Sequence, residues 1–278
     1  MTCASESALS ERTHDIGQAA EAGMRSIKLL LEYDGTAYQG WQSQRSGITI
    51  QDILSGTIGS ITGERIRLIG ASRTDAGVHA CGQVAAFTTG SDLSADVLKR
   101  ALNARLPQDI RILSAGEIHH AFHPRYDAIR KRYVYLLRLT GTGAAFLSRY
   151  TWYIRTMLNT DAMTKAAEYF SGEHDFSAFR GSGCSAKTTV RTISTIRISV
   201  LDALDFMTIS MPGSYIKVAM EANAFLRHMA RNIVGTLVEV GRGRISTEDI
   251  PAILASKDRT AAGPTAPAAG LFLEQVFY

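Results

Sequence analysis

Residues 70–79, Gly-Ala-Ser-Arg-Thr-Asp-Ala-Gly-Val-His, contain the group best suited to chemistry, an aspartate in a polar turn between two expected strands. The flanking strands would hold the Asp75 carboxylate rigidly yet leave it accessible, which suits a nucleophile or a base. Arg73 would favour the ionised form by its opposite charge, and Gly77 permits a tight or left-handed bend. The ordinary alternative is that Asp75 accepts backbone N–H bonds, because Asp is common in turns.

A second candidate lies at residues 131–135, Lys-Arg-Tyr-Val-Tyr, where basic and aromatic side chains share one expected strand. This mixture suits stacking on a nucleobase beside a bound phosphate. An ordinary amphipathic strand with aromatic core residues has the same pattern. Arg227 and Arg231, four apart on the flank of an expected helix, fit either phosphate pairing or plain solvation.

Motifs for metal or cofactor chemistry are weak in this sequence. His119, His120 and His123 form a cluster without acidic or cysteine partners, so surface or core histidines are favoured over a metal site. No GxxxxGK(S/T) phosphate loop and no GxSxG nucleophile motif occurs. The three cysteines are widely separated and form no CxxC pair, which disfavours a disulfide scaffold and favours a reducing compartment. We therefore expect neither a metal nor a cofactor.

The composition indicates a globular protein, and its basic charge is a modest argument for a polyanionic partner. The 278 residues are 45% hydrophobic and 20% charged, unlike disordered chains. Domains of ~150 residues are typical, so the length fits two domains or one large one. No apolar run approaches the ~18 residues of a membrane span, which argues against an integral membrane protein. Basic residues give a formal net charge of +4 and gather at 125–138, 180–197 and 227–244, where they would line one groove or form three solvated faces.

Residues 1–24 are expected to be a disordered tail. This tail contains several acids and no apolar segment, which argues against a secretory signal or a transit peptide. From Arg25 onward, the sequence pattern predicts the helices and strands that would position Asp75. Periodicity and turn signals predict a strand at 27–33, a helix at 49–61, strands at 65–71 and 78–88, a helix from Ser94 to about Asn103, and a strand at 110–118. The order β-α-β-β-α-β is that of a ferredoxin-like half with helices on one face.

The second half, from about Arg130, has similar element types. The pattern predicts strands at 132–139, 189–201, 214–221 and 271–278, helices at 160–170 and 225–240, and a small-residue loop at 261–270. We therefore expect an α+β fold of two ferredoxin-like or RRM-like halves that form an extended mixed, mainly antiparallel sheet. An N-terminal domain at 25–125 would carry the Asp75 turn, and a C-terminal domain would follow at 126–278.

Six blocks of residues, in order over about 27–278, resemble the tRNA pseudouridine synthase A family. The most specific is 73–79, Arg-Thr-Asp-Ala-Gly-Val-His, which closely resembles the family signature. The other blocks are 31–41, 122–135, 172–179, 223–235, and Lys-Asp-Arg-Thr at 257–260 followed by Ala-Gly-Leu at 269–271. One such block would be suggestive, whereas six in family order are highly specific.

The resemblance implies a fold, a reaction and a substrate. Family members are similar two-domain α+β proteins, normally homodimers, with a central cleft between the domains. They convert uridine to pseudouridine at positions 38, 39 and 40 of the tRNA anticodon stem-loop. By residue match, Asp75 takes the position of the catalytic aspartate, Arg73 orients it and Tyr133 stacks on the target base, while Arg231 is a cleft arginine and Leu271 an apolar wall of the pocket. The implied partner is tRNA in the cytoplasm, with no cofactor required.

Two readings from other classes remain open on the residues alone. One is a tRNA-binding protein of the same fold without catalysis, although a pure binder has no need of an acid among its basic residues. The other is a hydrolase that uses Asp75 and His79. It requires a metal or a second catalytic carboxylate, and no partner for Asp75 is evident in the sequence.

Overall fold

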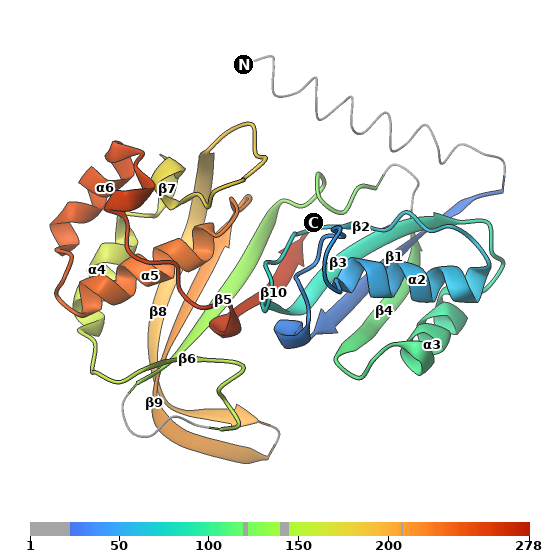
Figure 1. The fold of residues 1–278 in the computed structure, drawn as a ribbon, viewed down its shortest axis with the longest axis horizontal. Helices are drawn as coiled ribbons and strands as arrows, with labels where there is room; N and C mark the ends of the chain where they lie inside the picture. The colour runs from blue at the N-terminus through green and yellow to red at the C-terminus, as the bar shows by residue number, and fades with distance from the viewer. Residues whose placement is uncertain (1–22, 119–121, 140–144, 207) are drawn as a thin grey trace. The chain divides into compact units, whose positions relative to one another are not determined.

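The computed structural model describes residues 23–118, 122–139, 145–206 and 208–278, and Figure 1 shows it as a ribbon. The chain divides into two compact units. The N-terminal unit runs to Ile129 and includes Val276–Tyr278, and the C-terminal unit is Arg130–Gln275. Most of the expected tail and two of the three clustered histidines, His119 and His120, lie outside the described residues.

The N-terminal unit has the expected element order β-α-β-β-α-β. Its elements are β1 (Arg25–Tyr33), the short 3-10 helix η1 (Gly35–Ala37), α2 (Ile50–Thr62), β2 (Ile69–Gly70), β3 (His79–Thr89), α3 (Ala95–Arg105) and β4 (Ile110–Ile118). The strands pair antiparallel in the order β4-β1-β3-β2. β1 is therefore a central strand with β3 on one side and β4 on the other.

The strand predicted at 65–71 is wrong over most of its length, because only the two residues of β2 pair with β3. Just before β2, the carbonyl of Leu68 accepts a hydrogen bond from the Gln51 side chain of α2 at 2.8 Å. A helix side chain thus satisfies a backbone group that a longer strand would have paired with its neighbour. The alternating pattern of the sequence cannot distinguish these two outcomes.

Within the described part of this unit, α2 and α3 begin at capping residues that favour helix starts. Thr49 accepts a hydrogen bond from the backbone N–H of Asp52, and Ser94 accepts one from that of Val97. The apolar residues of the two helices and alternate residues of β1 are fully buried, namely Ile50, Leu54, Ile58, Leu98, Leu102, Ile27, Leu29 and Leu31. Burial of one such side chain contributes about 1.5–3 kcal/mol, so this core holds β1 and its partner β3 firmly.

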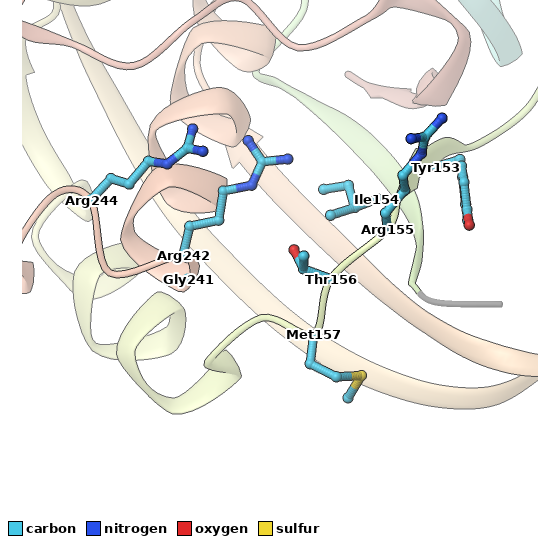
Figure 2. Close-up of a pocket in the computed structure, with 8 residues that line it drawn as sticks. All are labelled: Tyr153, Ile154, Arg155, Thr156, Met157, Gly241, Arg242 and Arg244. Atoms are coloured by element: carbon cyan, nitrogen blue, oxygen red, sulfur yellow. The ribbon is translucent and has the colours of Figure 1, made fainter.

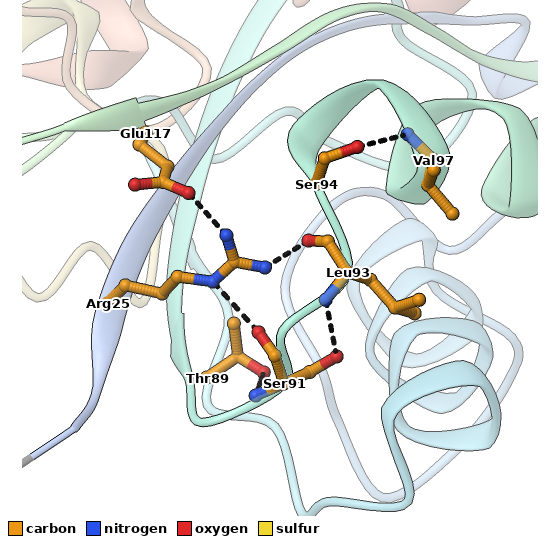
Figure 3. A network of polar contacts seen from close by, with 7 residues as sticks. All are labelled: Arg25, Thr89, Ser91, Leu93, Ser94, Val97 and Glu117. Carbon is orange, nitrogen blue, oxygen red and sulfur yellow. Dashed lines mark hydrogen bonds and ion pairs between the residues drawn. The ribbon is translucent and has the colours of Figure 1, made fainter.

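Arg25, the first residue of β1, fastens that strand to the connection between β3 and α3 (Figure 3). Its guanidinium donates hydrogen bonds to the carbonyls of Ser91, at 2.8 Å, and of Leu93, and it forms an ion pair with Glu117 of β4. The backbone N–H of Ser91 donates in turn to the hydroxyl of Thr89 at 3.1 Å. The start of β1 is therefore tied to β4 on one side and to the chain leaving β3 on the other.

The C-terminal unit is also α+β. Its strands are β5 (Arg130–Leu139), β6 (Trp152–Ile154), β7 (Gly172–Asp175), β8 (Val190–Phe206), β9 (Ile209–Ala222) and most of β10 (Leu271–Phe277). Its α-helices are α4 (Thr160–Glu168), α5 (Met229–Gly241) and α6 (Ile250–Ser256). The strand order is β10-β5-β9-β8-β7, with β6 parallel to β5 and the pairs β5–β9, β9–β8 and β8–β7 antiparallel. The sheet is mixed and mainly antiparallel, as expected.

Three short elements of this unit, β6, β7 and α6, are absent from the prediction. β6 has only three residues, and β7 reads Gly-Glu-His-Asp, which lacks an apolar alternation. α6 has seven residues and a proline near its start. Elements this short carry no more than two periods of a hydrophobic pattern, so tertiary packing decides them. The predicted small-residue loop at 261–270 begins at the last residue of a 3-10 turn, Arg259–Ala261, and ends with a second one, Ala268–Gly270.

Helix α5 begins one turn later than the predicted 225–240. His228, just before it, has a φ of 61° in the left-handed region, which no α-helix continues through. The predicted stripe is buried, at Leu226, Met229, Ile233, Leu237 and Val240, but so is the rest of α5 apart from Arg231. α5 is therefore a core helix rather than a surface one. Even so, no helix in the described ranges is both long enough and apolar enough to span a membrane.

Candidate active site

The turn between β2 and β3 presents Asp75 with a half-buried side chain, next to the buried Thr74. Gly77 has a φ of 76°, the left-handed conformation that favours glycine. The backbone N–H of Val78 donates to the carbonyl of Asp75 at 3.1 Å and closes the turn. The backbone around Asp75 is thus defined while its carboxylate remains within reach of solvent.

Thr74 and Gly77 form hydrogen bonds that join this turn to β1 and to the segment at residues 38–41 that follows β1. The hydroxyls of Thr74 and Tyr33 lie 2.7 Å apart in a hydrogen bond. The backbone N–H of Trp41 donates to the carbonyl of Thr74 at 3.0 Å, and that of Gly77 donates to the carbonyl of Tyr38 at 3.2 Å. Tyr33, Tyr38 and Trp41 are all buried, so water does not compete for these bonds.

Gln83 of β3 holds the other side of the turn. Its side chain is fully buried, and its carboxamide binds both backbone groups of Ser72. The Ser72 N–H donates to Oε1 at 3.2 Å, and Nε2 donates to the Ser72 carbonyl at 2.7 Å. Nε2 also lies 3.4 Å from the hydroxyl of Tyr33. Gln83 therefore links the chain on the N-terminal side of Asp75 to both β3 and β1.

A close approach of backbones at Gly40 completes this support. Gly40 has a φ of 88°, and a Cβ atom there would lie 2.5 Å from the carbonyl oxygen of Thr74 and 2.9 Å from the carbonyl carbon of Asp75. Any larger residue would both strain the backbone and displace the turn. Gly40 and Trp41 thus pack directly against the Asp75 turn, Gly40 through its close backbone approach and Trp41 through its hydrogen bond to Thr74.

His79, at the end of this turn, and His123, the described member of the histidine cluster, both have structural contacts. His79 is buried, and its Nδ1 lies 3.1 Å from the backbone N–H of Gly35 and from a carboxylate oxygen of Asp34. His123 accepts hydrogen bonds at Nδ1 from the backbone N–H groups of Arg125 and Tyr126. Among the described residues, no group of three or more His, Cys, Asp or Glu side chains is arranged to hold a metal.

Arg73 lies in the same turn as Asp75 and has an exposed side chain. Within the described part of the chain, no hydrogen bond or ion pair joins the Arg73 guanidinium to another residue. Its expected role in orienting Asp75 therefore stays a prediction. Gln83, Tyr33 and Trp41, which sequence reasoning missed, provide the contacts around the turn instead. Gln83 left a signal as a lone amide in the apolar run of β3, and Tyr33 and Trp41 lie in the family block at 31–41, where they were assigned no supporting role.

Tyr133, predicted to stack on a base, lies on β5 in the C-terminal unit and is 5% exposed. The ring of Phe225 meets it at 74° with ring centroids 4.9 Å apart. Tyr135, two residues along the same strand, is fully buried, and its hydroxyl donates to the carbonyl of Pro267 at 2.7 Å. Burial raises the pKa of Tyr135 above its usual range, and the nearby charge of Arg231 opposes this rise.

Arg231 and Leu271 both lie close to Tyr135. Nε of Arg231 donates to the carbonyl of Ala266 at 2.7 Å. Leu271, buried at the start of β10, follows Gly270, where a Cβ atom would lie 2.6 Å from the Tyr135 ring. The structure thus gathers Tyr135, Arg231 and the loop before β10 in the C-terminal unit. Arg73 and Asp75 belong to the N-terminal unit.

The loop before β10 is fixed to α5 by Asn232, a fully buried residue beside Arg231. Its Nδ2 donates to the carbonyl of Phe179 at 2.8 Å. Its Oδ1 accepts hydrogen bonds from Arg259 at 3.0 Å and from the hydroxyl of Thr265 at 2.6 Å. This buried network is satisfied on both amide atoms, so it defines one position for the loop.

The basic strand at 130–132 is largely paired rather than open to a ligand. Arg132 forms ion pairs with Glu221 at 2.6 Å and Glu274 at 3.2 Å, and Arg130 pairs with Glu221 at 3.1 Å. The hydrogen bond to Glu221 is the main cause of a raised pKa for Arg132. The two glutamates come from β9 and β10, far from Arg132 in sequence. Sequence spacing therefore gave no sign of this neutralisation.

Comparison with known proteins bears on the function of this site. Residues 30–127 and 166–278 match the family model described as tRNA pseudouridine synthase. The tRNA pseudouridine synthase A of Acetivibrio thermocellus is 47% identical over 255 residues, which cover 92% of this chain and 100% of that protein. The protein of the same name from Thermoanaerobacter pseudethanolicus is 45% identical with the same coverage.

Among solved structures, a chain from an H/ACA RNP bound to a substrate RNA containing 2′-deoxyuridine is 13% identical with a TM-score of 0.31. That match covers 77% of this chain and 44% of the other, and a likeness at this level adds nothing to the assignment. The family model and the relatives, by contrast, match most of the sequence described above. This chain belongs to the tRNA pseudouridine synthase family, a family of isomerases.

Proposed function

We propose that this chain converts uridine to pseudouridine at positions 38, 39 and 40 of the tRNA anticodon stem-loop, with Asp75 as the nucleophile. The observation that carries the proposal is the Asp75 turn itself. Its backbone is bound through Ser72, Thr74 and Gly77, while the carboxylate stays half-buried. Such a rigid but reachable carboxylate suits nucleophilic catalysis.

The reaction requires few groups from the protein. The N1–C1′ bond of uridine breaks, the uracil turns, and C5 bonds to C1′. A proton leaves C5 and one is taken up at N1, so atoms and electrons balance without a redox partner. Ionised Asp75 attacks the nucleoside, at C1′ or C6, or stabilises the cleaved sugar as a glycal forms.

The target base must leave its stack before it reacts, which costs a few kcal/mol. Stacking on Tyr133, worth roughly 1–3 kcal/mol per base, offsets much of this cost. In the proposed scheme Arg231 contributes charge beside the RNA and Leu271 an apolar wall for the uracil. The fixed loop before β10 supports this role, because Arg231 and Leu271 are both anchored through it.

The assembly and location of the enzyme are part of the same proposal. We expect a homodimer that acts on tRNA in the cytoplasm, as the family resemblance implies. A molar mass of about twice the 30.2 kDa of the chain, measured by light scattering, supports the dimer. A value equal to one chain contradicts it.

The decisive experiment is tritium release from tRNA that carries [5-³H]uridine, with wild type and Asp75→Ala compared side by side. Wild type is expected to release tritium, because the C5 proton is lost. Asp75→Ala is expected to lose turnover by more than about a thousandfold, as removal of a nucleophile does, with tRNA affinity within a few-fold of wild type. Asp92→Ala, which removes an exposed aspartate of the same unit, serves as the matched control.

The outcomes separate the proposed enzyme from its alternative. Normal turnover in Asp75→Ala removes Asp75 from the mechanism. No release by either protein, with tRNA still bound, makes the chain a catalytically inactive tRNA-binding protein of the same fold. Mapping of the modified positions in wild-type product then tests the assignment to positions 38–40.

A further inference from the structure

A pocket of about 560 Å³ lies in the C-terminal unit where the chain leaving β6 faces the end of α5 (Figure 2). Two chain segments line it, Tyr153–Met157 after the start of β6 and Gly241–Arg244 at the end of α5. Arg155, Arg242 and Arg244 extend from these segments toward the same side in Figure 2. We call this the arginine pocket.

The arginine pocket carries more positive than negative charge. Glu239 of α5 is the carboxylate that pairs there, with Arg242 at 2.7 Å and with Arg244 at 3.1 Å. Three arginines against this one carboxylate leave a formal charge of +2 (3 − 1) among these four residues. The Glu239 side chain is only 10% exposed, whereas that of Arg244 is 67% exposed. The positive charge therefore faces solvent.

Stabilisation of the end of α5 explains the presence of two of the three arginines. The end of α5 carries the negative pole of the helix dipole, which cations such as Arg242 and Arg244 stabilise. This role does not account for Arg155, which arrives on the other segment and has an exposed side chain. In the described ranges, Arg155 makes no hydrogen bond or ion pair with another residue.

The chemistry of the lining favours a phosphodiester. Guanidinium groups bind phosphate oxygens through paired N–H donors, and the Thr156 hydroxyl offers one more donor. Tyr153 adds an aromatic face beside these donors. Cations next to an aromatic ring are the combination that binds the backbone and bases of single-stranded RNA.

We propose that the arginine pocket binds a backbone phosphate of the RNA substrate. This rests on the proposed function, and it adds a contact made by residues other than those of the reaction. Arg155 is the central ligand, because its charge is not shared with a protein carboxylate. Arg244 assists from the exposed rim, and Arg242 mainly positions the end of α5 through Glu239.

The test measures tRNA affinity against salt for wild type, Arg155→Ala and the double variant Arg155→Ala/Arg244→Ala. Fluorescence anisotropy of labelled, unmodified tRNA at several KCl concentrations gives the slope of log K against log salt. Each phosphate contact contributes about 0.7–0.9 to this slope. We expect Arg155→Ala to reduce the slope by about that amount and to raise Kd about tenfold at low salt.

Two controls make the result specific to the pocket. Arg155→Lys keeps the charge and is expected to keep most of the salt slope. Arg100→Ala removes another exposed arginine, from α3 of the N-terminal unit, and is expected to leave the slope unchanged. All of these positions are exposed, and circular dichroism checks that each variant is folded.

The outcomes distinguish failure of this inference from failure of the proposed function. An unchanged slope and affinity in the double variant overturn the RNA contact, even if wild type is fully active. An equal loss in Arg100→Ala overturns it too, because the effect is then one of net charge. Binding of inorganic phosphate that Arg155→Ala abolishes, without any change for tRNA, assigns the pocket to free phosphate instead. Absence of both tRNA binding and turnover in wild type rejects the proposed function itself.

Discussion

The Asp75 turn and the arginine pocket use opposite kinds of polar interaction. The bonds described for the turn join buried neutral groups, the carboxamide of Gln83, the hydroxyls of Tyr33 and Thr74, and backbone amides. The pocket instead sets three arginines against one nearly buried carboxylate. One region binds its own backbone, and the other leaves charge exposed to solvent.

This difference follows from what each region is proposed to do. A nucleophile must stay in position, and neutral bonds in a dry interior hold a backbone without the desolvation cost of a buried ion. A contact to RNA gains from exposed charge, because it attracts phosphate over about a Debye length of 8–10 Å and releases counterions on binding. In this proposal, one part of the chain positions the nucleophile and a separate part attracts the RNA.

Replacement of Gln83 by leucine gives the largest effect expected from this comparison. The N–H and carbonyl of Ser72 lose their partner, and the Asp75 turn shifts. A displacement of about 1 Å at a catalytic group costs around a hundredfold in rate, so single-turnover tritium release should fall about that much. The affinity for tRNA and its salt slope should not change. A folded Gln83→Leu protein with normal turnover would falsify the supporting role of Gln83.

A smaller effect is expected from Tyr33→Phe. This change removes the hydroxyl that bonds Thr74 and that accepts a long hydrogen bond of 3.4 Å from Gln83, and it leaves the ring in the core. The bond from Trp41 to Thr74 and those from Gln83 to Ser72 remain, and the main loss is the bond to Thr74, since a neutral hydrogen bond is worth about 0.5–1.5 kcal/mol. Turnover should therefore fall about 2–10-fold, again with unchanged tRNA affinity. A loss as large as that of Gln83→Leu would show that the two supports act as one unit.

A stability measurement tests whether ionic support in the C-terminal unit depends on pH. Asp175 accepts hydrogen bonds from the Ser177 hydroxyl at 2.6 Å and the Ser177 N–H at 3.0 Å, and it pairs with Lys257 at 3.0 Å. Its hydrogen bonds, the Ser177 hydroxyl first, hold the pKa of this carboxyl well below its usual value of 3.8. The folded form thus gains stability above pH of about 4 and loses it as the pH falls further.

We therefore expect Asp175→Asn to lower the free energy of unfolding by about 1–3 kcal/mol at pH 7. The deficit should shrink progressively as the pH falls below 4, because the unfolded chain then binds a proton at Asp175 that the folded wild type does not. Urea unfolding at pH 7 and at pH 3 measures both values. Gln83→Leu is the contrasting control, because its lost bonds are neutral and its deficit should be similar at both pH values. Equal stability of Asp175→Asn and wild type at pH 7 contradicts the ionic role.

Local pattern was sufficient for much of the fold. β4 was predicted residue for residue, the caps at Thr49 and Ser94 start α2 and α3, and β1, β3 and β5 lie within two residues of their predicted starts. These elements carry several periods of an apolar pattern, which one strand or helix geometry satisfies. The family signature at 73–79 is equally local, and the match to the family model confirms the family that it indicated.

Tertiary structure decided the rest, because the deciding partners are distant in sequence. β2 is shorter than the predicted strand because the Gln51 side chain donates a hydrogen bond to the carbonyl of Leu68. Glutamates of two other strands neutralise the charge of Arg132. The hydrogen bonds of Gln83 to the Asp75 turn also join residues that are distant in sequence. The same is true of the arginine pocket, which Arg155 and the end of α5 line together. A sequence shows which groups are present and their local geometry. Which groups meet across the fold depends on the packing of the whole core.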